Sequence, residues 1–67
     1  MSDEIAELAS LEVEFIRTIT SDPEVAHAAE KELWRSVLIQ AAAGRDVKAA
    51  AIEALKTEDI DFPRWFA

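Results

Sequence analysis

Three residues have types and spacings that could do chemistry: Glu12, His27 and Glu30. His27 and Glu30 are three apart and are neighbours if their segment is helical. Carboxylates and an imidazole can bind iron, manganese or zinc, and a Glu–His pair can move a proton. With Glu12 they resemble half of a carboxylate-bridged di-metal site that a two-fold dimer would complete, although helical bundles use the order Glu-x-x-His. The sequence therefore raises a metal site between subunits as one hypothesis.

The positions of the two glutamates are unusual. At 100° per residue, Glu12 lies about 40° from Leu8, inside an apolar arc of its helix. Glu30 lies about 60° from Leu33, inside the arc of the next helix. The arc of the first helix contains Ile5, Leu8, Ala9, Leu11, Phe15, Ile16 and Ile19. The arc of the second contains Ala26, Ala29, Leu33, Trp34, Val37, Leu38 and Ala41.

Both glutamates are eight residues from the turn, so they lie about 12 Å from it and should be level in an antiparallel hairpin. Two facing carboxylates cannot both stay charged if they are shielded from water, because burial and their mutual repulsion both disfavour the charged forms. One can be protonated, a metal can lie between them, or a donor can satisfy them. The donors available are His27, the Trp34 indole, an arginine such as Arg64, or trapped water. A further alternative is that this helix seam contacts a partner.

Local signals predict one all-α domain over residues 1–67. Helices are expected over about 3–19, 23–43 and 46–56, followed by a tail at 57–67. The first two form an antiparallel hairpin, with Asp22 as N-cap, Pro23 at the first helical position and Gly44 ending the second helix. Asp46 is expected to cap the third helix, which buries Val47, Ala50, Ala51, Ala54 and Leu55.

Length and composition suggest support from other subunits. A chain of 67 residues without cysteine is near the lower limit for an unaided hydrophobic core, so a homo-oligomer, with a dimer favoured, is expected. Ile39 and Ile52 fall outside the main stripes. They could lie beneath the tail or make intersubunit contacts.

The net charge of −7 is concentrated in the first half, where residues 1–32 carry nine acids and two bases. Such a field disfavours nucleic acid and anionic lipid and favours a host protein with a basic surface. Glu4, Glu7 and Glu14 on the outer side of the first helix are the candidate contacts, although an acidic helix face is often only solvated. No segment resembles a membrane span or a secretory leader, so a cytoplasmic location is expected.

The C-terminal tail holds three of the five aromatic residues within its last seven residues. Pro63 favours an extended turn, which would fold Phe62 and Trp65 or Phe66 back onto the bundle. Alternatively, the tail is an exposed docking patch, since aromatic residues and arginine dominate interface hot spots. That patch comprises Phe62, Arg64, Trp65 and Phe66.

Catalytic signatures are absent from the sequence. It contains no Gly-rich phosphate loop, no cysteine nucleophile and no His-Glu-x-x-His motif. No serine has an evident base beside it. We therefore expect no enzymatic activity and no cofactor.

Two stretches of residues 22–67 are distinctive: Ala-Leu-Lys-Thr at 54–57 and Asp-Phe-Pro-Arg-Trp at 61–65. With them, this region resembles small uncharacterised helical proteins encoded by tailed bacteriophages and prophages. The resemblance implies a protein that acts in the bacterial cytoplasm, in host modulation or anti-defence, by blocking or sequestering a host factor. It assigns no activity to any residue.

Three functions are compatible with the sequence. The first is a non-enzymatic protein-interaction module that uses the acidic first helix or the aromatic tail. The second is a metal-binding helical oligomer with Glu12, His27 and Glu30 at a subunit seam. The third is an assembly or scaffold subunit of a larger particle.

Overall fold

The computed structural model describes residues 2–64 and contains three α-helices and one short 3-10 helix. The elements are α1 (Ser2–Thr18), α2 (Pro23–Ala42), α3 (Lys48–Leu55) and η1 (Lys56–Asp59). No strand occurs in this described part of the chain, so the all-α prediction is confirmed. The first two helices end within about one residue of their predicted bounds. The third was expected over 46–56, but it begins two residues later and passes into η1.

The predicted turn signals act at both connections. The Asp22 carboxylate accepts a hydrogen bond from the Val25 backbone N–H at 3.3 Å, and Pro23 opens α2. Gly44 follows α2 with φ of +83°, a left-handed conformation that costs other residues free energy. Asp46 accepts from the Lys48 N–H at 3.2 Å, so its carboxylate does meet the start of α3, although Val47 occupies the cap position.

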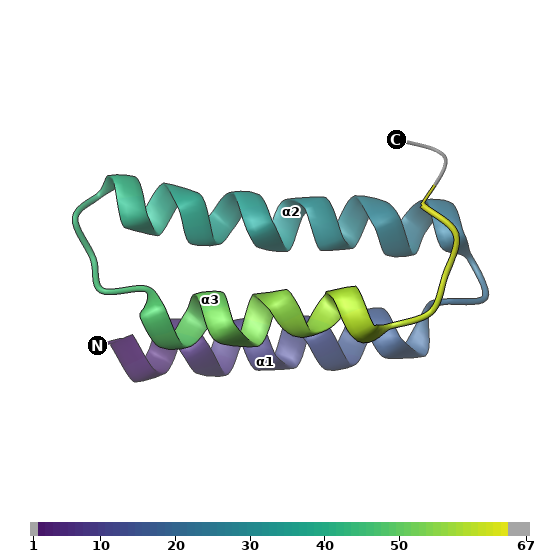
Figure 1. Ribbon diagram of the computed structural model, residues 1–67, viewed down its shortest axis with the longest axis horizontal. Coiled ribbons are helices and arrows are strands. Elements are labelled where there is room, and N and C mark those ends of the chain that lie inside the picture. Colours follow the sequence, from purple (N-terminus) through teal and green to yellow (C-terminus); the bar gives the residue numbers. More distant parts are fainter. Residues whose placement is uncertain (1, 65–67) are drawn as a thin grey trace.

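The three helices are arranged so that α1 and α3 run in the same direction and α2 runs opposite to both (Figure 1). The packing is most extensive between α1 and α3. Ala9, Ala50 and Ala54 are buried there, and their small side chains let the two backbones approach closely. The predicted antiparallel hairpin of α1 and α2 is therefore present, but α3 is the closer neighbour of α1.

The core faces inward from all three helices. Val13 and Ile16 of α1 are its largest fully buried apolar side chains. Leu33 and Val37 of α2 close it from one side, and Phe62 of the C-terminal segment closes it at one end. Each of these residues removes apolar surface from water, which is the main favourable term in folding.

The predicted apolar arc of α1 is wrong at its centre. Leu8, Leu11 and Phe15 are 63%, 66% and 50% exposed, whereas Ala9 and Val13 are buried. The physical reason is that α1 packs against two helices at once, so its core face is centred on Ala9, Val13 and Ile16. On a helical projection Leu11 and Phe15 then lie at roughly 160° and 200° from Val13. The bundle buries Ala9, Val13 and Ile16 of α1 and leaves three large apolar residues outside.

The outer surfaces of α2 and α3 also carry apolar residues. Ile39 and Ile52 are exposed, so neither lies beneath the described part of the tail, residues 57–64. Leu38 and Leu55 were expected to be buried but are exposed as well, and both line an open groove between α2 and α3. Among the described residues, no helix combines the length and the apolar character needed to cross a membrane.

Candidate functional site

The C-terminal segment folds back onto the bundle. After η1, residues 60–64 run towards the N-terminal half of α2 (Figure 1). Ile60 and Phe62 are buried and belong to the core. Phe62 is therefore not part of an exposed docking patch, and that part of the prediction is wrong. Trp65 and Phe66, the other aromatic members of the predicted patch, lie outside the described residues.

Arg64 fastens this segment to α2 through Glu30. Its Nε and Nη2 atoms donate to the two carboxylate oxygens of Glu30, both at 2.9 Å. Nη2 also donates to the carbonyls of Thr57 at 2.7 Å and Ile60 at 3.1 Å, and Nη1 donates to the carbonyl of Phe62 at 3.2 Å. The guanidinium lies 3.9 Å from the Phe62 ring centroid, within cation–π range. One side chain thus joins α2, η1 and the terminal segment.

The electrostatics of this pair favour two charged partners. Burial raises the pKa of the Glu30 carboxyl, but the hydrogen bonds and positive charge of Arg64 outweigh burial and hold that pKa below its ordinary value. The hydrogen bonds that Arg64 donates to Glu30 raise the pKa of Arg64. Of the predicted ways to satisfy a buried Glu30, an arginine donor is therefore confirmed.

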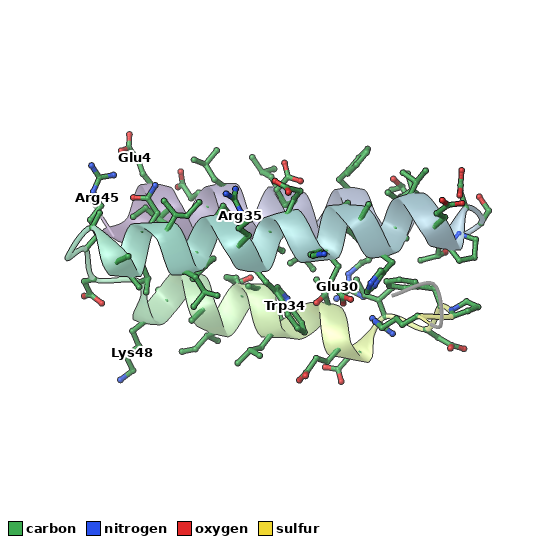
Figure 2. The ribbon with its side chains drawn as sticks, turned by 90° about the horizontal axis from the view of Figure 1, so that it is seen from above. Glu4, Glu30, Trp34, Arg35, Arg45 and Lys48 are labelled. Atoms are coloured by element: carbon green, nitrogen blue, oxygen red, sulfur yellow. The ribbon has the colours of Figure 1, made fainter. Side chains whose placement is uncertain are left out.

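Trp34 and Thr57 extend the polar contacts between α2 and the end of α3. The Trp34 indole N–H donates to the carbonyl of Ala54 and to the Thr57 hydroxyl, each at 3.1 Å. The Thr57 hydroxyl itself donates to the Ala54 carbonyl at 3.1 Å. Figure 2 shows Trp34 and Glu30 on the side of α2 that faces α3 and the terminal segment. These contacts close the last turns of α3 against α2.

His27 adjoins this cluster without joining it. Its Nδ1 atom lies 3.8 Å from a Glu30 oxygen, which is beyond hydrogen-bond distance. Nδ1 is buried and has no hydrogen-bond partner among the described residues. The structure therefore shows no hydrogen bond between His27 and Glu30 for the acid–base pair that the sequence suggested, whereas both Glu30 oxygens accept from Arg64. The hydrogen bonds of the cluster join α2, η1 and the terminal segment.

Glu12 is not placed as predicted. It is exposed and lines a shallow hollow beside Leu33, Ser36 and Gln40, whereas Glu30 is buried at 3% exposure. The two carboxylates do not face one another, because the core face of α1 is rotated away from Glu12. The described residues of one chain contain no group of three His, Asp or Glu side chains that could hold a metal ion. A metal site shared by two chains stays a prediction.

The exposed side of α1 presents a second surface, the α1 stripe, formed by Leu8, Leu11 and Phe15. Their spacings of three and four residues place them on one helix face. Each is at least half exposed. The structure thus leaves one continuous apolar stripe on the outside of the bundle.

Acidic side chains border the α1 stripe. On a helical projection Glu7 and Glu14 lie on one side of the stripe, Glu12 on the other, and Glu4 beyond Leu8 towards the N-terminus. All four are exposed. Only Glu14 has a basic partner in the described chain, Arg17 at 3.1 Å. The sequence predicted Glu4, Glu7 and Glu14 as contacts but missed the three apolar residues, which a helical projection assigned to the core.

Comparisons with known proteins add no further assignment. No protein-family model, curated protein or solved structure matches this chain. The likeness of residues 22–67 to phage-encoded proteins therefore remains a prediction.

Proposed function

We propose that this protein is a non-enzymatic interaction module whose α1 stripe binds a basic, amphipathic helix of a partner protein. The observation that carries the proposal is the exposure of Leu8, Leu11 and Phe15 on one face of α1. Large apolar side chains that lie together and are rimmed by polar residues mark interaction sites. An apolar helix face suits a helix-in-groove or helix-on-helix contact with anchors at i, i+3 and i+7.

The acidic border indicates the charge of the partner. A helix laid along the α1 stripe would place its flanking side chains beside Glu7, Glu12 and Glu14. Lysine or arginine there would gain complementary charge, which favours fast association and suppresses acidic competitors. A second copy of α1 would instead place glutamates opposite glutamates, and this repulsion disfavours self-pairing through the same face.

The resemblance to phage-encoded proteins directs the proposal towards a bacterial host protein. Blockade of a host factor, in host modulation or anti-defence within the cytoplasm, requires only tight binding and no chemistry. A stripe of three anchors with an acidic border is sufficient for that role. This part of the proposal depends on the resemblance, whereas the binding surface depends on the structure.

Self-association is a separate part of the proposal. Alanine supplies four of the ten core residues, Ala9, Ala26, Ala50 and Ala54. Because alanine buries little apolar area, a short chain with such a core gains considerably from a partner subunit. An assembly or scaffold role would follow if the chain alone formed a closed oligomer of fixed size.

The binding proposal is tested with two designed helical peptides of identical leucine pattern, one flanked by lysines and one by glutamates. We expect the lysine peptide to bind the protein, the glutamate peptide not to bind, and added salt to weaken the complex. Leu11→Glu should weaken binding about tenfold or more, as truncating or charging an interface anchor does. Glu7→Lys should weaken it less. Fluorescence anisotropy of labelled peptides measures all five effects.

Ile52→Glu on α3 is the matched control, because it introduces the same charge at a similarly exposed apolar residue on another face. It should leave the affinity for the lysine peptide unchanged. The proposal fails if Leu11→Glu and Ile52→Glu change binding equally, since the α1 stripe would then contribute nothing specific to the complex. It also fails if the lysine peptide does not bind.

A further inference from the structure

The outer side of α3 and η1 carries a second apolar surface with opposite charges at its two ends. We infer that this surface, the α3 stripe, pairs with the same surface of a second copy of the chain in an antiparallel, two-fold dimer. The stripe consists of Lys48, Ile52, Leu55 and Glu58. The inference rests on the self-association part of the proposed function and is independent of the partner bound by α1.

Helical spacing aligns these four residues. Lys48, Ile52 and Leu55 fall within about 60° on α3. Leu55 precedes η1, and in a 3-10 helix residues three apart are eclipsed, so Glu58 continues the line of Leu55. All four are exposed, with Ile52 and Leu55 each at 54%. Figure 2 shows Lys48 pointing away from the bundle at the start of α3.

The charge order of the α3 stripe is complementary to its own reverse. Positions 48 and 58 are symmetric about residue 53, which lies between Ile52 and Leu55. A two-fold axis at that point therefore brings Lys48 of each copy opposite Glu58 of the other and stacks the apolar residues in the middle. A parallel arrangement would instead bring like charges together. The charge order of the α3 stripe therefore favours an antiparallel contact with the α3 stripe of a second copy of the chain.

Neighbouring charges do not oppose this pairing. Lys56 is already paired with Glu53 of the same chain at 2.9 Å, so these two contribute little net charge. Asp59 adds a second negative charge at the Glu58 end. Asp46, near Lys48, accepts a hydrogen bond from the Lys48 backbone N–H and keeps its negative charge, which the adjacent Arg45 balances. The two ends of the α3 stripe therefore have opposite charges. The α1 stripe is bordered by acidic residues only and has no such complementarity with a second copy.

Continuous apolar surface flanks the α3 stripe on the side of α2. Trp34, Leu38, Ala51 and Leu55 line a shallow groove between the two helices. The contacts around it are almost entirely apolar, so a helix that follows the stripe meets little polar surface that it would have to desolvate. The partner's Ile52 and Leu55 can pack beside this groove, as ridges of one helix pack into grooves of another.

A charge exchange tests the inference with the full chain. The oligomeric state is measured by sedimentation velocity over a range of protein concentrations. We expect a dimer that Ile52→Glu weakens about tenfold or more, because the variant buries charge at the centre of the contact. Lys48→Glu and Glu58→Lys should each weaken it about threefold. The double variant, K48E with E58K, should restore the affinity of the native chain.

Two controls match these changes in charge elsewhere on the bundle. Leu11→Glu on α1 and Glu32→Lys on α2 should leave the dimer affinity unchanged, and circular dichroism checks that every variant keeps its helices. Two outcomes would overturn the inferred dimer interface: a dimer affinity that Ile52→Glu does not change, or a double variant whose dimer affinity is no higher than that of the single variants. Either outcome leaves self-association itself in place. A native chain that stays monomeric up to millimolar concentration overturns both.

Discussion

Replacing Phe62 with alanine is expected to lower the free energy of unfolding by about 3–5 kcal/mol, the usual cost of truncating a buried phenylalanine. Phe62 is 5% exposed and packs in the core with the helices. A domain of this size has a total stability of only about 3–10 kcal/mol. The substitution should therefore leave a large fraction of the chain unfolded at 25 °C. Urea unfolding followed by far-UV circular dichroism measures the difference.

Phe15→Ala provides the matched control, since it removes the same atoms from a residue that is half exposed on the α1 stripe. It should change stability by much less than Phe62→Ala, while removing an anchor for the lysine peptide. Equal and small effects of the two substitutions would mean that the C-terminal segment does not hold the bundle together in solution.

Glu30→Gln is expected to destabilise the protein by about 3 kcal/mol, at the lower end of the range for breaking a buried ion pair. Arg64 is one third exposed, which moderates the cost, but the amide cannot accept both of its hydrogen bonds. The guanidinium would also hold the carbonyls of Thr57, Ile60 and Phe62 less firmly. Glu12→Gln, on the exposed side of α1, should be nearly neutral and serves as the control.

The loss of stability caused by Glu30→Gln should become smaller as the pH falls. Because the pKa of Glu30 is lower in the folded protein than its ordinary value of 4.5, its contribution is complete above about pH 4.5 and is lost as the pH falls through the folded pKa. The difference in stability between the native protein and Glu30→Gln should therefore shrink in acid. If Glu30→Gln instead stabilised the protein at neutral pH, the cost of burying the Glu30 charge would exceed the stabilisation by Arg64. That result would contradict the ion pair between Glu30 and Arg64.

The local signals for helix ends were sufficient to predict the fold class and the connections. Asp22 with Pro23, and Gly44, act within the first turn or just after the last turn of a helix, so their effects do not depend on tertiary packing. The same holds for the extended conformation imposed by Pro63. From these residues, the ends of the helices and the return of the C-terminal segment can be predicted without knowledge of the tertiary packing.

The orientation of α1 could not be predicted in the same way. Its sequence carries apolar residues around more than half of the helix, so a projection offers two possible core faces: one with Leu8, Leu11 and Phe15, and one with Ala9, Val13 and Ile16. The structure takes the second face, because α3 is lined with alanine and comes close. Which face is buried depends on this contact between segments about 40 residues apart in the sequence.

The polar cluster was predictable in part. A glutamate within an apolar arc needs a donor, and Arg64 was one of several candidates. The choice among them depends on the path of the chain after η1, which brings Arg64 across the bundle to α2. The sequence also gives no indication that three backbone carbonyls would accept hydrogen bonds from the Arg64 guanidinium.

The most direct test of the interaction surface is a titration of ¹⁵N-labelled protein with the lysine-flanked peptide, followed by two-dimensional NMR. We expect chemical-shift changes to concentrate on the backbone amides of α1 around Leu8, Leu11 and Phe15, with those of α3 nearly unaffected. Changes confined to α3, spread evenly over the bundle, or absent at saturating peptide would contradict the assignment of α1 as the binding surface.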